Sequence, residues 1–148
     1  MIHTTLTFLT NVLNEYLKIR LADPDINRVF LTSVATESQG IVIPSSSLGL
    51  SLINIEEERI NKDQSTRKIS NSGQAHYLNP ELRLNLYILI SSNFQDKVAD
   101  DPTDDYAEGL KQLSYIISFF QARNVFTKEN SPLLASIDPD IEKLIVEL

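Results

Sequence analysis

The sequence predicts an α/β fold in which a mixed β-sheet packs against two main helices. Residues 2–20 and 104–121 carry apolar side chains at steps of three and four, which place them on one face of a helix. Residues 82–91 alternate apolar and other side chains, which is typical of a strand with one buried face. Because each apolar face must be buried against another element, these segments require at least two packed layers.

The first half of the chain predicts one helix followed by two strands. The helix at 2–20 ends before Asp23-Pro24-Asp25, since the residue before a proline disfavours the helical conformation. Residues 28–34 are β-branched and aromatic and predict a strand, and the aliphatic residues 50–55 predict a second one. Residues 35–49 are rich in Ser, Gly and Pro, which indicates a loop or a broken strand.

The second half predicts a long strand, a helix, a helical turn at Ser131-Pro132 and a last strand at 142–148. We expect this last strand to join 28–34, 50–55 and 82–91 in one sheet. The core between the strand and the second helix should then consist of aliphatic side chains from both: Leu84, Leu86, Ile88, Leu110, Leu113 and Ile117. Truncating one of these leucines to alanine should cost about 2–5 kcal/mol.

Two segments of opposite charge are candidates for contacts with other proteins. Glu56-Glu57-Glu58 would point acids to both faces of a buried strand, so we expect the strand to leave the sheet there. The polar stretch 59–79 follows, and it is either a solvated, mobile loop or an interface arm. Its basic residues are Arg59, Lys62, Arg67 and Lys68. The acidic segment is either a solvated loop and helix start or a docking patch, and it comprises Asp96, Asp100, Asp101, Asp104, Asp105 and Glu108.

Composition argues against several classes of protein. Thirteen Lys and Arg against twenty Asp and Glu give a net charge of −7, which disfavours general nucleic-acid binding. The longest unbroken apolar run, 86–90, is far shorter than the roughly 18 residues of a membrane-spanning helix. With 148 residues and no evident linker, we expect a single domain over 1–148.

No catalytic or cofactor motif stands out. The four glycines are too widely spaced for a dinucleotide-binding loop or a P-loop, and there is no cysteine. His3 and His76 lie far from each other in the sequence and from carboxylates at ligand spacing, so neither predicts a zinc site. We therefore expect no enzyme activity, no cofactor and no metal. A monomeric adaptor or ligand-binding module would have the same composition.

Four stretches, in this order and spacing, resemble a known family. They are the first helix through Leu13-Asn14-Glu15-Tyr16-Leu17, the strand 50–59 with its acidic-then-basic end, the proline-led strand 79–90, and the helix from Tyr106 to Leu113 that continues to Asn130-Ser131-Pro132. The family is that of the cap, or tail-terminator, proteins of extracellular phage-tail-like contractile injection systems, of the antifeeding-prophage and virulence-cassette type. Its members continue beyond 144–146 into a tryptophan-bearing helix and a last strand. This sequence has no tryptophan and stops at Leu148, so it is either a shorter member or one without its C-terminal part.

The resemblance implies a tail-terminator-like fold and a structural, non-enzymatic protein. It implies a ring, of six copies, that stops the polymerisation of an inner tube and a contractile sheath. The implied partners are copies of the chain, the tube and sheath proteins, and a paralogous cap subunit, with no nucleic acid or membrane. The implied location is the bacterial cytoplasm during assembly, and then a particle that can be released from the cell. The expected interface residues are the charged ones: Glu56, Glu57, Glu58, Arg59, Lys62, Arg67, Lys68, Asp100, Asp101, Asp104, Asp105 and Glu108.

Overall fold

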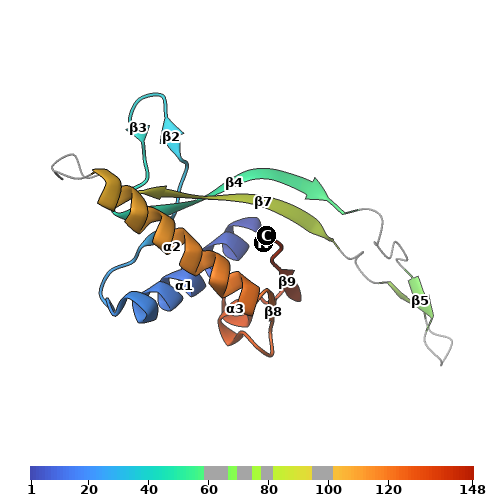
Figure 1. The fold of residues 1–148 in the computed structure, drawn as a ribbon. Coiled ribbons are helices and arrows are strands. Elements are labelled where there is room, and N and C mark those ends of the chain that lie inside the picture. Colours follow the sequence, from blue (N-terminus) through green and yellow to red (C-terminus); the bar gives the residue numbers. More distant parts are fainter. Residues whose placement is uncertain (59–66, 70–74, 78–81, 95–101) are drawn as a thin grey trace. The chain divides into compact units, whose positions relative to one another are not determined.

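The α/β class predicted from the sequence is confirmed by a computed structural model of the chain (Figure 1). The structure describes residues 1–58, 67–69, 75–77, 82–94 and 102–148. The described elements, in chain order, are α1 (Ile2–Leu21), β1 (Val29–Leu31), β2 (Ala35–Thr36), β3 (Gly40–Ile41), β4 (Ser47–Glu57), β5 (Arg67–Ile69), β6 (Ala75–Tyr77), β7 (Leu84–Asn93), α2 (Pro102–Ala122), β8 (Val125–Thr127), α3 (Pro132–Ile137) and β9 (Lys143–Ile145).

The chain forms two compact units. The first contains residues 1–51 and 89–148, and the second contains residues 52–88. The second unit therefore contains residues 52–57 of β4, residues 84–88 of β7, and the paired strands β5 and β6. The prediction of one domain over 1–148 stays a prediction.

Three strands form the main sheet, in the order β1-β4-β7. β1 is parallel to β4, with Val29 opposite Leu48 and Leu31 opposite Leu50. β7 runs in the opposite direction to β4 (Figure 1). The parallel pairing is possible because the connection from β1 to β4, which contains β2 and β3, is long enough to return the chain to the same end of the sheet.

The prediction that residues 142–148 form a fourth strand of this sheet is wrong. β9 pairs instead with β8 in a separate antiparallel ladder, in which Val125 lies opposite Ile145 and Thr127 opposite Lys143. Val125-Phe126-Thr127, directly after α2, is β-branched and aromatic and offers β9 a nearer partner. The backbone N–H of Val146 extends the ladder by donating to Asn124 O at 2.8 Å.

The core of the first unit lies around α1. Its fully buried side chains include Phe8, Leu13 and Leu17. Phe8 meets Phe126 of β8 edge to face, with ring centroids 5.4 Å apart, and Phe119 of α2 stacks on the same ring at 6.3 Å. α1 and β8 are therefore joined through aromatic packing that continues to α2.

A buried asparagine fixes α1 to β1. The Asn14 side chain donates from Nδ2 to Val29 O at 2.8 Å. Its Oδ1 accepts from the backbone N–H groups of Arg28 and Val29, both at 2.8 Å. One side chain thus satisfies three backbone groups at the start of β1 that a helix neighbour would otherwise leave without partners.

The predicted core face of α2 is wrong. Leu110 and Ile117 are 46 % and 47 % exposed, whereas Phe120, which the apolar period also places in the core, is buried together with Gly109, Gln112 and Ile116. The side of α2 that carries Gly109 lies close to β7: a Cβ there would meet Ser92 Oγ at 3.1 Å and Phe94 Cδ2 at 3.3 Å. The glycine therefore allows a close approach on that side of the helix and turns the aliphatic stripe outward. The partners predicted from the strand, Leu84, Leu86 and Ile88, are half-buried and belong to the second unit.

The acidic end of β4 does not leave the sheet as predicted. β4 continues through Glu57, and the backbone N–H of Glu58 still donates to Arg83 O at 3.0 Å. The prediction assumed a buried strand, but the side chains from Ile53 to Glu57 are exposed. Acids that alternate between two solvated faces carry no desolvation penalty.

The polar stretch 59–79 contains regular structure that the sequence did not predict. β5 and β6 pair antiparallel, with Arg67 opposite Tyr77, Lys68 opposite His76 and Ile69 opposite Ala75. The remaining residues of this stretch lie outside the described residues. The predicted mobility of the stretch stays a prediction.

Candidate functional site

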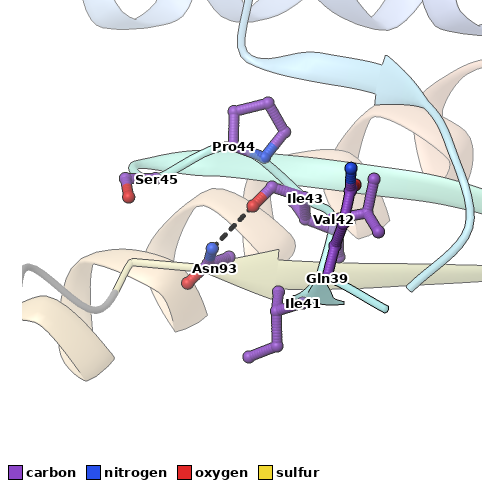
Figure 2. A pocket seen from close by; sticks show the side chains of 7 residues that line it. All are labelled: Gln39, Ile41, Val42, Ile43, Pro44, Ser45 and Asn93. Carbon is purple, nitrogen blue, oxygen red and sulfur yellow. Dashed lines mark hydrogen bonds between the residues drawn. The ribbon is translucent and has the colours of Figure 1, made fainter. Parts of the chain in front are cut away.

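The described residues hold no group of three or more His, Cys, Asp and Glu side chains that could bind a metal ion. Among the helices of the described segments, none is long and apolar enough to cross a membrane. One hollow of about 460 Å³ lies beside β3, lined by Gln39, Ile41, Val42, Ile43, Pro44, Ser45 and Asn93 (Figure 2). The Asn93 side chain donates from Nδ2 to Ile43 O at 2.7 Å and so closes one wall. This lining contains amide and hydroxyl groups but no group that titrates near neutral pH, so the hollow offers no general acid or base.

The acidic end of β4 is organised by a tyrosine of β7. Tyr87 Oη donates to Glu56 Oε2 at 3.0 Å, and Asn54 Nδ2 donates to Glu56 Oε1 at 3.1 Å. The hydrogen bond to the Glu56 carboxylate raises the pKa of Tyr87, because removing the phenolic proton would place a second negative charge beside the first. Of the two other predicted interface acids here, Glu57 is exposed and Glu58 is half-buried.

The structure describes only part of the acidic segment that precedes and begins α2. Asp104 is exposed, Asp105 is half-buried, and Asp96, Asp100 and Asp101 lie outside the described residues. Glu108 accepts from Gln112 Nε2 at 3.0 Å and from Lys111 Nζ at 3.1 Å. The hydrogen bond from Gln112 is the main cause that lowers the pKa of Glu108. These contacts tie Glu108 to its own helix.

The basic and acidic candidates lie on different compact units: β5 belongs to the second unit, and α2 belongs to the first. Arg67 and Lys68 lie on β5 and pair through their backbone with β6. Arg59 and Lys62 lie outside the described residues. Whether the two charged segments meet between copies stays a prediction.

An apolar stripe on α2 faces solvent, although its two leucines and its isoleucine were predicted to lie in the core. We call Tyr106, Leu110, Leu113 and Ile117 the α2 stripe; Tyr106 is 69 % exposed, and Leu113 is half-buried. Exposed and buried apolar stripes follow the same helical period, so periodicity does not separate them. Ile116 widens the apolar arc of α2, but the sequence pattern does not show which side of this arc is exposed.

The polar groups beside the α2 stripe are satisfied by the helix itself. Ser114 Oγ donates to Leu110 O at 2.8 Å, and Ser118 Oγ donates to Ser114 O at 2.9 Å. α1 occupies the opposite side of the helix: Arg20 lies over the Tyr115 ring at 5.3 Å, and the rings of Tyr16 and Phe119 are 4.9 Å apart. The stripe therefore faces away from α1 and is flanked by small, uncharged side chains.

A second apolar surface lies on the two-stranded ribbon formed by residues 52–57 of β4 and 84–88 of β7. The contacts of Glu56 place Asn54 and Tyr87 on one face of this ribbon. Because side chains alternate along a strand, Ile53 and Ile55 lie on the other face, where they are 64 % and 43 % exposed. We call the aliphatic side chains of that face the ribbon face: Ile53, Ile55, Leu84, Leu86 and Ile88.

Comparison with known proteins gives one family. The model of the family described as the Pvc16 N-terminal domain matches residues 4–148 of the 148-residue chain. No curated protein matches the chain. The matched range covers both compact units and all described elements except the first residues of α1.

Proposed function

The chain belongs to the family of the Pvc16 N-terminal domain, and from that premise we propose that it is the structural cap of a phage-tail-like injection system. Family membership links the chain to phage-tail-like virulence cassettes. The proposal goes further in three respects. The chain forms a ring of six copies, this ring ends the inner tube and the contractile sheath, and it stops their polymerisation.

The family match over nearly the whole chain carries the proposal. The described surface supports a structural protein, since its features are exposed apolar and acidic surfaces on helices and strands rather than a cluster of catalytic groups. The cap has no catalytic role. Its partners are copies of itself, the tube and sheath proteins, and a paralogous subunit. It acts in the bacterial cytoplasm while the particle is assembled.

Polymerisation of the tube protein in the presence of the chain tests the proposal. Purified tube subunits are allowed to polymerise with and without the chain, and tube lengths are measured by negative-stain electron microscopy. We expect shorter tubes as the ratio of chain to tube subunits rises, with extra density at one end. Unchanged lengths together with a monomeric chain in light scattering would favour the alternative, a monomeric adaptor or ligand-binding module.

Charge exchange tests whether the charged segments orient neighbouring copies. Exposed ion pairs are worth about 0–1 kcal/mol each, so they would orient the ring rather than hold it together. Reversing Arg67 and Lys68 to Glu should impair assembly, and reversing Asp104 and Asp105 to Lys in the same chain should partly restore it. Salt near 1 M, which shortens the screening length to about 3 Å, should also weaken assembly. If both variants fold but the double reversal restores nothing, the charged segments face another protein.

A further inference from the structure

Two buried side-chain atoms have no hydrogen-bond partner among the residues that the structure describes. They are Arg28 Nε, directly before β1, and Gln112 Oε1, on α2, and both belong to the first compact unit. The Nε–H of an arginine can only donate a hydrogen bond, and the amide oxygen of a glutamine can only accept one. Buried polar groups of native proteins are normally satisfied, because losing the bond to water without a replacement is unfavourable. The two atoms therefore require a partner that accepts from the first and donates to the second.

The rest of the Arg28 guanidinium is held in place. Its Nη1 donates to Ser46 O at 3.0 Å, and its Nη2 donates to Asp23 Oδ2 at 3.1 Å. Because the guanidinium is planar and rigid, these two bonds also fix the direction of the Nε–H. Arg28 therefore cannot turn its Nε–H toward solvent without breaking both bonds.

The amide of Gln112 is held in the same way. The residue is 2 % exposed, and its Nε2 donates to Glu108 Oε1 at 3.0 Å. Rotating the amide by half a turn would place Oε1 against the Glu108 carboxylate, and two acceptors would then face each other. The bond to Glu108 thus determines which amide atom is the oxygen, and it directs Oε1 away from that carboxylate.

Both side chains lie at the same end of the main sheet. Ser46 O, which binds Arg28, directly precedes β4, and β7 runs in the opposite direction and ends beside it, immediately before Phe94 (Figure 1). α2 lies against this end, since a Cβ at Gly109 would meet Phe94 Cδ2 at 3.3 Å. Gln112 follows Gly109 by three residues and therefore projects from the same buried side of α2.

Electrostatics agree with this placement. The hydrogen bond from Gln112 is the main cause that lowers the pKa of Glu108, and the positive charge of Arg28 lowers this pKa as a smaller cause. Arg28 is therefore near enough to the bonded pair of Glu108 and Gln112 for its charge to act on that pair.

We propose that one buried water molecule bridges these two side chains, accepting from Arg28 Nε–H and donating to Gln112 Oε1. Water can accept and donate at the same time, and buried waters typically bond to polar groups that would otherwise be unsatisfied. The bridge joins the segment before β1 to the buried side of α2. It goes beyond the proposed function, because it requires neither a second copy of the chain nor another protein.

A double-mutant cycle in urea unfolding tests the bridge. Arg28→Lys keeps the positive charge but removes Nε, and Gln112→Met keeps the length of the side chain but removes the amide. If the water joins the two groups, the effects of the single changes overlap. The double variant should then lose about fivefold less in the unfolding equilibrium constant than the product of the two single effects. Agreement with that product within about twofold would overturn the proposal.

Two controls separate the bridge from other effects of the substitutions. Gln121→Met, at an exposed glutamine of the same helix, should leave the unfolding equilibrium constant unchanged. A second cycle combines Arg28→Lys with Glu108→Gln and tests whether the coupling runs through the Glu108 charge. We expect this second cycle to be additive within about twofold, because both Arg and Lys carry the charge. Equal coupling in the two cycles would overturn the proposal.

A crystal structure of the wild-type chain, at a resolution that shows ordered water, tests the bridge without any variant. We expect electron density for one water at about 2.7–3.2 Å from both Arg28 Nε and Gln112 Oε1. A direct bond between these two atoms, or a different partner for either of them, would overturn the proposal.

Discussion

Replacing Asn14 by alanine should loosen the junction of α1 and β1. The side chain makes three hydrogen bonds of 2.8 Å to backbone groups of Arg28 and Val29. Asn14 and Val29 are both buried, so after truncation water cannot easily replace the two bonds to Val29. The Arg28 N–H is closer to solvent and is more easily satisfied.

The expected loss of stability is about 2–4 kcal/mol, because each buried backbone group left without a partner costs about 1–3 kcal/mol. For a chain of this length the melting temperature should fall by about 5–12 °C. Urea unfolding followed by circular dichroism measures the change, and the m-value should stay constant because the unfolded surface is unchanged. Asn11→Ala is the control, since Asn11 is exposed on the same helix. If Asn14→Ala comes within about 0.5 kcal/mol of the control, the three bonds do not stabilise the junction as argued.

Two further predictions concern stability. Leu17→Ala should lower the free energy of unfolding, measured in urea, by about 2–5 kcal/mol because Leu17 is fully buried. Leu110→Ala should lower it much less in the monomer, because the Leu110 side chain is 46 % exposed. Equal losses for the two variants would contradict the burial seen for α2. The second concerns pH. The pKa of Asp138 is lowered from 3.8, first by the hydrogen bond from Thr4 Oγ1 and next by the α-amino group of Met1. A carboxylate whose folded pKa is lowered stabilises the fold above its unfolded pKa, and this contribution disappears as the pH falls through the folded value. Asp138→Asn should therefore lose less stability than the wild type when unfolding is followed from neutral pH to below pH 3.8, and identical acid profiles would contradict the assignment.

The helices and the long strand were predictable because their signals are local. The period of apolar residues located α1 and α2 within two residues of their observed ends, and strict alternation located β7. The rotation of α2 was not predictable in this way. It depends on the close approach of Gly109 to Ser92 and Phe94, which are far away in the sequence.

The pairing of segments that lie apart in the sequence was the second feature that could not be predicted. β8 is only three residues long and directly follows a helix, so its β-branched and aromatic residues alone did not identify β9 as its partner. The role of Asn14 could not be predicted either, because its side chain bonds to the backbone of β1, and the helical pattern does not show which strand lies against that side of α1. The prediction for the acids at the end of β4 was wrong because it assumed a buried strand, whereas the side chains from Ile53 to Glu57 are exposed.

The candidate surfaces were predictable only as composition. Runs of charge marked the acidic start of α2 and the basic residues of β5 as candidates, and their role in an interface stays a prediction. The exposed α2 stripe has the same residue pattern as a buried one, and for this reason Leu110 and Ile117 were predicted to lie in the core. Burial in the structure was needed to recognise it as a surface.

The central claim is that the chain caps the end of a phage-tail-like particle. Cryo-electron microscopy of purified particles that carry this chain tests it most directly, with particles from cells lacking the chain as the control. We predict one ring of this chain at a single end of the tube and sheath, and particles of irregular length in its absence. Density for the chain along the sheath or at no fixed place, with particle lengths unchanged when the chain is missing, would contradict the claim.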